Sequence, residues 1–134
     1  MTLVQTQPRS TETTVVARTV ADAMGAAGPQ VCDDMTVEVV LSVMAGARTD
    51  RLLVCDADGL CTGLVTQDRL TAARDDSAYT DRTRLRDILG DRGPFTSPVA
   101  TMAEAGRMMR YSRVDALPVV DEHGSALGVL VLAR

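Results

Sequence analysis

The chain repeats itself at a fixed offset, and this repeat constrains the fold more than any other feature. Residues 19–69 align without a gap on residues 84–134, at an offset of 65 residues, and 14 of the 51 aligned pairs are identical. Many of the identical pairs are turn or core residues, such as Gly28 with Gly93 and Asp56 with Asp121. Because the turn residues stay in register, both copies are predicted to share one structural plan.

Each copy is predicted to form a βαββ unit that follows a short helix. In the first copy the short helix covers residues 20–24, the strands cover 30–32, 52–55 and 61–66, and Thr36 is the N-cap of the longer helix. In the second copy the corresponding segments are 85–89, 95–97, 117–120 and 126–132, with Thr101 as the N-cap. An Asp-x-x-Gly turn joins the last two strands of each copy, which is typical of a hairpin.

A unit of about 50 residues buries too little surface to be stable alone, so the two copies are predicted to pack on each other about an approximate twofold axis. The predicted fold class is α/β (α+β), with small sheets flanked by helices. We expect a disordered tail at 1–14, a first domain at 15–74, a linker at 75–83 and a second domain at 84–134. Because the sequence stops at Arg134, the second domain is expected to lack its closing helix.

Composition excludes several classes of function. A net charge of −4 and an aromatic content of 2% argue against nucleic acid as a partner. No apolar run reaches membrane-spanning length, and the three cysteines follow no metal-site spacing, so a reduced, cytoplasmic protein is expected. With one histidine and no phosphate-binding, zinc-protease or nucleophile motif, the sequence predicts that the chain is not an enzyme.

The sequence resembles tandem cystathionine-β-synthase (CBS) domain pairs of the stand-alone bacterial type. The resemblance rests on TVADAM, on DRLLVCDADGLCTGLVTQDRL in the first copy and on RVDALPVVDEHGSALGV in the second, and it covers about residues 18–134. It implies two units that pair through their sheets, association as homodimers, and regulatory binding of AMP, ADP, ATP or S-adenosylmethionine in clefts between the units. It also implies that the binding state is transmitted to a protein partner, which the sequence does not identify.

The two copies depart differently from the family's ribose-binding signature, Gly-h-h-Thr/Ser-x-x-Asp, in which h is an apolar residue. The first copy has Gly63-Leu64-Val65-Thr66, but its aspartate comes one residue early, as Asp68, and Arg69 stands at the acidic position. The second copy has neither the hydroxyl nor the carboxylate. We therefore expect one site per chain, with no other cofactor. Its predicted residues are Val31, Cys32, Arg51, Leu53, Thr66 and Asp68, with Arg51 as the phosphate contact.

Each candidate also has a structural interpretation. Arg51 is either a phosphate contact or a solvated surface side chain, and Thr66 and Asp68 either hold a ligand or cap the helix that follows. Arg48 and Arg113 are equivalent in the repeat, and an arginine in both copies favours a structural role at a helix C-terminus.

Two functions remain open. The first is a ligand sensor, and the alternative is a ligand-independent dimerisation or interaction scaffold whose nucleotide sites have decayed. A homodimer is expected to use the helices 37–47 and 102–111.

Overall fold

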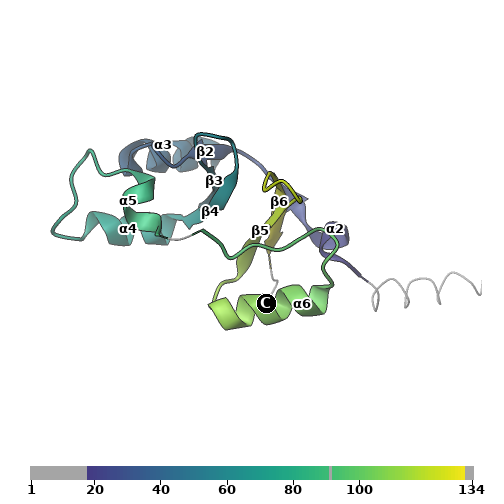
Figure 1. Ribbon diagram of the computed structural model, residues 1–134. Coiled ribbons are helices and arrows are strands. Elements are labelled where there is room, and N and C mark those ends of the chain that lie inside the picture. The colour runs from purple at the N-terminus through teal and green to yellow at the C-terminus, as the bar shows by residue number, and fades with distance from the viewer. Residues whose placement is uncertain (1–17, 91, 132–134) are drawn as a thin grey trace, which may run out of the picture.

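The computed structural model describes residues 18–90 and 92–131, which form two three-stranded sheets flanked by helices (Figure 1). The helices are α2 (Val20–Ala23), α3 (Val37–Ala47), α4 (Gln67–Arg74), α5 (Leu85–Leu89) and α6 (Met102–Ser112). The strands are β1 (Gly25–Ala26), β2 (Gln30–Cys32), β3 (Arg51–Cys55), β4 (Cys61–Thr66), β5 (Ala116–Val120) and β6 (Ala126–Val131). The predicted tail at 1–14 and residues 132–134, where the second copy ends, lie outside the described residues. The predicted mixed fold of small sheets and helices is confirmed.

The first unit is built on the sheet with the strand order β2-β3-β4. Strand β2 runs parallel to β3, and β3 pairs with β4 in the antiparallel hairpin that the Asp-x-x-Gly turn predicts. One face of this sheet packs against helices in a core of aliphatic and methionine side chains. The buried members are Val31, Val37, Val40, Met44, Leu52, Val54, Val65, Leu70 and Leu85.

The second unit is built on the sheet with the strand order β1-β6-β5. Its core contains Val20, Ala105, Met109, Leu117, Val119 and Leu130. The strand predicted at 95–97 is reduced to a single bridge, in which Thr96 pairs with Val119. Pro98 has no N–H to donate, whereas Asp33, its equivalent in the first copy, donates its N–H to the carbonyl of Cys55 at 2.8 Å, so the ladder cannot extend past Thr96 toward Pro98.

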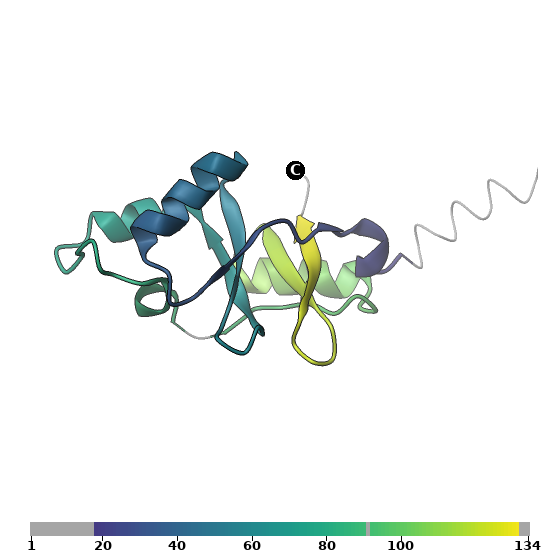
Figure 2. The same cartoon turned by 90° about the horizontal axis from the view of Figure 1, so that it is seen from above.

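The two short helices are exchanged between the units. Val20 of α2 lies in the core of the second unit, and Leu85 of α5 lies in the core of the first; neither side chain is exposed. The backbone contacts are reciprocal as well. The N–H of Val20 donates to the carbonyl of Ala100 at 2.9 Å, and the N–H of Leu85 donates to that of Met35 at the same distance. These residue pairs are equivalent in the repeat, so an approximate twofold axis relates the units (Figure 2).

Strand β1 adds to the edge of β6, which the sequence analysis did not predict. Gly25 pairs with Val129, and Ala26 with Gly128. A Cβ atom at position 128 would lie 2.4 Å from the carbonyl oxygen of Gly25. Only glycine therefore allows β1 to approach β6 this closely.

The predicted helix caps are present. The hydroxyl oxygens of Thr36 and Thr101 accept hydrogen bonds from the N–H groups of Val39 and Glu104, and Glu104 completes a capping box. Arg48 and Arg113 end α3 and α6 in the left-handed conformation, at φ of 55° and 58°. The structural role expected of this pair is thus confirmed, although the backbone rather than the guanidinium performs it.

Among residues 18–90 and 92–131, no helix has both the length and the apolar character needed to span a membrane.

Candidate functional site

Alternation along β3 gives the first sheet a second face, which meets the other unit. Leu52 and Val54 point into the helix-covered core, so Arg51 and Leu53 point the opposite way. Their partners in β4, Thr66 and Leu64, share that face. Because β4 lies against β5, the space between the two sheets is lined by side chains from both units.

One cavity between the sheets, the Arg51 cleft, has a volume of about 330 Å³. Its walls are mostly apolar side chains and the chain segment that leads from β1 to β2. The lining residues are Ala23, Gly25, Ala26, Ala27, Gly28, Pro29, Arg51, Leu53, Leu64, Val129 and Val131. Arg51 is the only charged side chain among them, so the cleft is an apolar slot with one cation at its end.

A second cavity, the Thr66 cleft, has a volume of about 410 Å³. It is lined by Leu64, Thr66, Gly93, Pro94, Arg113, Val114, Asp115, Ala116 and Pro118. The repeat relates the two clefts, because Gly93, Pro94, Ala116 and Pro118 correspond to Gly28, Pro29, Arg51 and Leu53. The repeat-equivalent positions differ in polarity: Ala116 replaces Arg51 in the Thr66 cleft, and Val131 replaces Thr66 in the Arg51 cleft.

A narrower cavity of about 240 Å³, the acidic crevice, has lining residues in common with both clefts. Its lining consists of Asp50, Arg51, Thr66, Gln67, Asp68 and Asp115. Three carboxylates face one guanidinium here, so the crevice has a net negative charge at neutral pH. Arg51, Thr66 and Asp68, which were predicted as ligand residues, meet in this crevice.

Arg51 is only partly neutralised by its surroundings. Its Nε lies 3.6 Å from Oδ1 of Asp50, whose carboxylate is largely exposed. Its Nη1 is buried and has no hydrogen-bond partner among the described residues. An unpartnered buried donor of a charged group is costly, and an acceptor supplied by a ligand would remove that cost. The sequence analysis interpreted Arg51 either as a phosphate contact or as a solvated surface side chain. Because Arg51 is half-buried, it is not a fully solvated side chain.

Thr66 and Arg69 both stabilise local structure. The hydroxyl oxygen of Thr66 accepts a hydrogen bond from the N–H of Arg69 at 3.2 Å, so Thr66 is the N-cap of α4. Arg69, which stands at the acidic position of the ribose signature, donates from Nη2 to the carbonyl of Ile88 at 2.6 Å and so closes the end of α5. Asp68 is exposed in the first turn of α4 and makes no cap of its own.

The other two predicted residues lie on β2, away from the three cavities. The side chain of Val31 is 3% exposed and belongs to the first core. Cys32 lies at the end of β2 beside Asp33, on the face that carries Leu53. The structure therefore brings Arg51 and Leu53 together in one cleft and Arg51, Thr66 and Asp68 in the crevice, but it places Val31 and Cys32 elsewhere. Their role in binding stays a prediction.

The sequence analysis missed the residues that the second unit contributes. Val129 and Val131 line the Arg51 cleft, and Asp115 lines the crevice. The repeat contained the signal that could have found them: once the sheets face each other, Val129 and Val131 must occupy the places that Leu64 and Thr66 occupy by symmetry.

Comparison with known proteins identifies the family. The CBS domain model matches residues 20–76 and again residues 85–133, so the chain belongs to the CBS domain family and holds two copies of the domain. A CBS domain-containing protein of Dictyostelium discoideum is 28% identical over 107 residues, which are 72% of this chain and 74% of that protein.

Solved structures share the fold. The structure of CBSX2 in complex with AMP has a TM-score of 0.71 at 21% identity, covering 84% of this chain and 89% of that one. The CBS domain pair of protein MJ0100, solved in complex with 5-methylthioadenosine and S-adenosyl-L-methionine, has a TM-score of 0.73 at 13% identity, covering 86% of this chain and 90% of that one. At these identities the likeness concerns the fold alone.

Proposed function

We propose that this chain is a non-enzymatic, cytoplasmic regulatory module that binds one adenosyl ligand in its Arg51 cleft and signals the bound state to a protein partner. The ligand is AMP or S-adenosylmethionine. Three unpaired cysteines fit a reducing compartment such as the cytoplasm. CBS domain pairs are typically regulatory modules rather than catalysts.

The unpartnered Nη1 of Arg51 carries the proposal. A phosphate or carboxylate oxygen of a ligand in the cleft would give this nitrogen the charge-assisted hydrogen bond that it lacks. Val31 and Cys32 contribute to the site only through the strand that positions residues 25–29.

The shape and polarity of the Arg51 cleft suit a flat heteroaromatic base. Leu53, Leu64 and Val129 provide apolar surface, and the backbone of residues 25–29 offers hydrogen-bonding groups for the edge of the base. Asp68 lines the adjoining crevice, and we propose that its carboxylate accepts hydrogen bonds from sugar hydroxyls.

The charge of the crevice supports a ligand with little negative charge. Asp50, Asp68 and Asp115 repel a triphosphate more strongly than a monophosphate, whereas the positively charged sulfonium and amino groups of S-adenosylmethionine are attracted. We therefore expect AMP and S-adenosylmethionine to bind more tightly than ATP. The AMP and S-adenosylmethionine complexes of structurally similar CBS pairs support this choice of ligand class.

A thermal shift measurement with AMP, S-adenosylmethionine, ADP and ATP tests the proposal. A ligand at 100 times its dissociation constant should stabilise the fold by about 2.7 kcal/mol. AMP or S-adenosylmethionine should raise the melting temperature more than ATP at equal concentration. A shift that is largest with ATP would contradict the assignment to the Arg51 cleft, and no shift with any of the four ligands would leave the scaffold as the function.

Asp68→Ala tests the sugar contact. Losing a hydrogen bond to a charged group costs about 1.5–3 kcal/mol, so the variant should bind AMP about tenfold more weakly or worse. Because Thr66 already caps α4, the variant should keep the melting temperature of the unliganded protein. Unchanged affinity would show that Asp68 does not contact the ligand.

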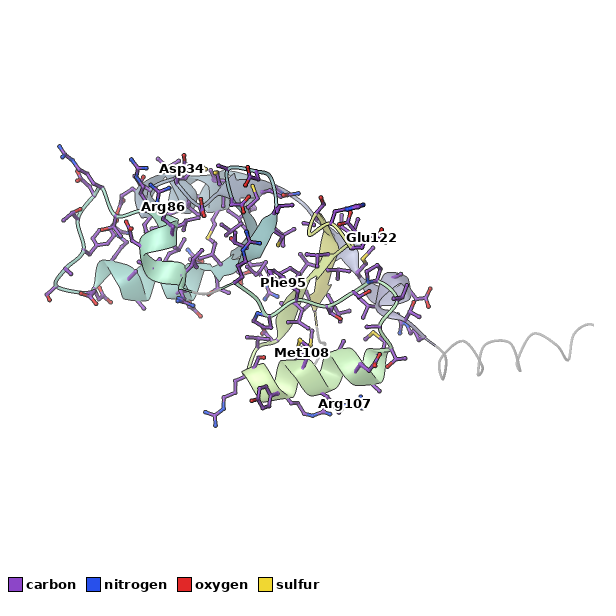
Figure 3. The ribbon with its side chains drawn as sticks, in the orientation of Figure 1. Asp34, Arg86, Phe95, Arg107, Met108 and Glu122 are labelled. Carbon is purple, nitrogen blue, oxygen red and sulfur yellow. The ribbon has the colours of Figure 1, made fainter. Side chains whose placement is uncertain are left out.

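A specific observation favours an interaction role as well. Apolar side chains are exposed on the two long helices: Val39 of α3 is 47% exposed, and Met108 (labelled in Figure 3) and Tyr111 of α6 are 40% and 91% exposed. We infer that these surfaces meet in a homodimer, since exposed apolar patches on a monomer are unfavourable. Light scattering should give twice the chain mass at micromolar concentration, and Tyr111→Ser with Met108→Ser should reduce it. A monomer mass for the wild type would contradict the dimer.

A further inference from the structure

The three cysteines lie side by side at one end of the first sheet, although they are far apart in the sequence. Cys32 of β2 is the direct partner of Cys55 in the parallel ladder, and Cys55 is the direct partner of Cys61 in the antiparallel ladder. Partners in a ladder point to the same face of the sheet. The thiols of Cys32 and Cys55 therefore point to one face, whereas a register shift between Val54 and Cys55 interrupts the alternation opposite Cys61.

Only adjacent strands bring their thiols within bonding range. Neighbouring strands lie about 4.8 Å apart, and a disulfide requires Cα atoms about 4.4–6.8 Å apart. Cys55 meets this condition with either neighbour. Cys32 and Cys61 do not meet it with each other, because the whole of β3 separates them.

Exposure distinguishes the two possible pairs. Cys61 is 2% exposed, and its Sγ is directed to the carbonyl of Gly63. Cys32 and Cys55 are both partly exposed, so a dissolved oxidant can reach either. These three thiols and the neighbouring carboxylates do not form a group that could hold a metal ion, since the described residues contain no such group.

We propose that Cys32 and Cys55 are a redox-active dithiol, which a two-electron oxidant such as hydrogen peroxide converts into a reversible disulfide between β2 and β3. The cross-link would hold the three-residue strand β2 against the sheet. Strand β2 continues directly from residues 25–29, so its attachment restricts the chain segment that crosses between the units.

The electrons balance in two steps. The thiolate of one cysteine attacks the peroxide, the O–O bond breaks, and a sulfenic acid and hydroxide form; the hydroxide takes up a proton to become water. The second thiolate then attacks the sulfenic sulfur, the S–O bond breaks, and a second hydroxide leaves and is protonated. Two thiols are oxidised to one disulfide while one peroxide is reduced to two waters.

The surroundings of Cys55 indicate the order in which Cys32 and Cys55 react. Burial, the neighbouring Cys32 thiol and the carboxylates of Asp56 and Asp33 all raise the pKa of Cys55. Its thiolate is therefore scarce at neutral pH, which suits the resolving cysteine better than the attacking one. Cys32 makes the first attack, and the overall reaction should accelerate as the pH rises, because more of the Cys55 thiol is then deprotonated.

Peroxide treatment of the purified protein, followed by thiol alkylation and peptide mapping, tests the proposal. The wild-type chain should lose two of its three thiols and the mass of two hydrogen atoms, with Cys32 linked to Cys55, and dithiothreitol should restore all three. Three results would overturn the proposal: a link between Cys55 and Cys61, links only between chains on a non-reducing gel, or a gain of oxygen without a disulfide.

Two variants complete the test. Cys61→Ala removes the third thiol and keeps a small apolar side chain, so it should form the disulfide at the wild-type rate. Cys55→Ala removes the middle thiol, so it should form no disulfide within the chain. An intact disulfide yield in Cys55→Ala, or its loss in a Cys61→Ala protein with a wild-type circular dichroism spectrum, would contradict the pairing.

Discussion

Arg51 and Thr66 are direct partners across β3 and β4, yet Arg51 lines one of the two clefts between the units and Thr66 lines the other. The two side chains meet only in the acidic crevice between them. The polar groups that the sequence analysis assigned to a single site are thus divided by the approximate twofold axis.

This division makes two arginines a matched pair. Arg51 lines the Arg51 cleft, and Arg113 lines the Thr66 cleft. Arg51→Ala should weaken AMP binding at least tenfold, because losing a hydrogen bond to a charged group costs about 1.5–3 kcal/mol. Arg113→Ala should leave the affinity within about twofold. Calorimetric titration of both variants measures the difference. A larger loss of AMP affinity for Arg113→Ala than for Arg51→Ala would indicate that the ligand binds in the Thr66 cleft.

The repeat, together with the turn and capping residues, was sufficient to predict the two units, their hairpins and the caps at Thr36 and Thr101. Strand β1 could not be predicted, since its pairing with β6 depends on a close backbone approach at Gly128 that no local pattern encodes. The sequence pattern also could not predict which residues line each cleft. Strand alternation shows that Arg51 and Thr66 share a face, but the packing of the opposite sheet decides which cleft each one lines.

The exchanged helices should make the two units unfold as one. Leu85 is completely buried in the core of the unit that precedes it in the chain. Leu85→Ala should therefore cost about 2–5 kcal/mol and keep a single cooperative transition. Urea denaturation followed by circular dichroism measures both. Val99, which is 80% exposed, is the control: Val99→Ala should change stability by no more than about 0.5 kcal/mol. Two separate transitions in the wild type would show that the exchange does not couple the units.

Gly128 tests the close approach of β1. Alanine at this position would place its Cβ 2.4 Å from the carbonyl oxygen of Gly25, so β1 must move and stability should fall by about 1–3 kcal/mol. Gly46 in α3 has no heavy atom within 4 Å of such a Cβ, so Gly46→Ala should stabilise by about 0.5–1 kcal/mol. Thermal denaturation of the two variants should give shifts of opposite sign, and equal shifts would count against the pairing of β1 with β6.

The hairpin aspartates should make stability depend on pH in acid. Hydrogen bonds from the N–H groups of Ser125 and His123 lower the pKa of Asp121 below the ordinary aspartate value of 3.8. A carboxyl group with a lowered pKa in the folded state contributes stability above its unfolded pKa and loses it as the pH falls through the folded pKa. Asp121→Asn should therefore be less stable than wild type at pH 7, with a difference that shrinks below pH 3.8. Denaturation at several pH values checks this, and a constant difference would mean that the charge plays no part.

The central claim is that the chain binds one adenosyl ligand, in the cleft that contains Arg51. Calorimetric titration of the wild-type protein with AMP, and separately with S-adenosylmethionine, measures the number of sites per chain directly. The account predicts one site per chain for the ligand that binds, and loss of that site in Arg51→Ala. Two equivalent sites per chain, or one site that persists unchanged in Arg51→Ala, would contradict it.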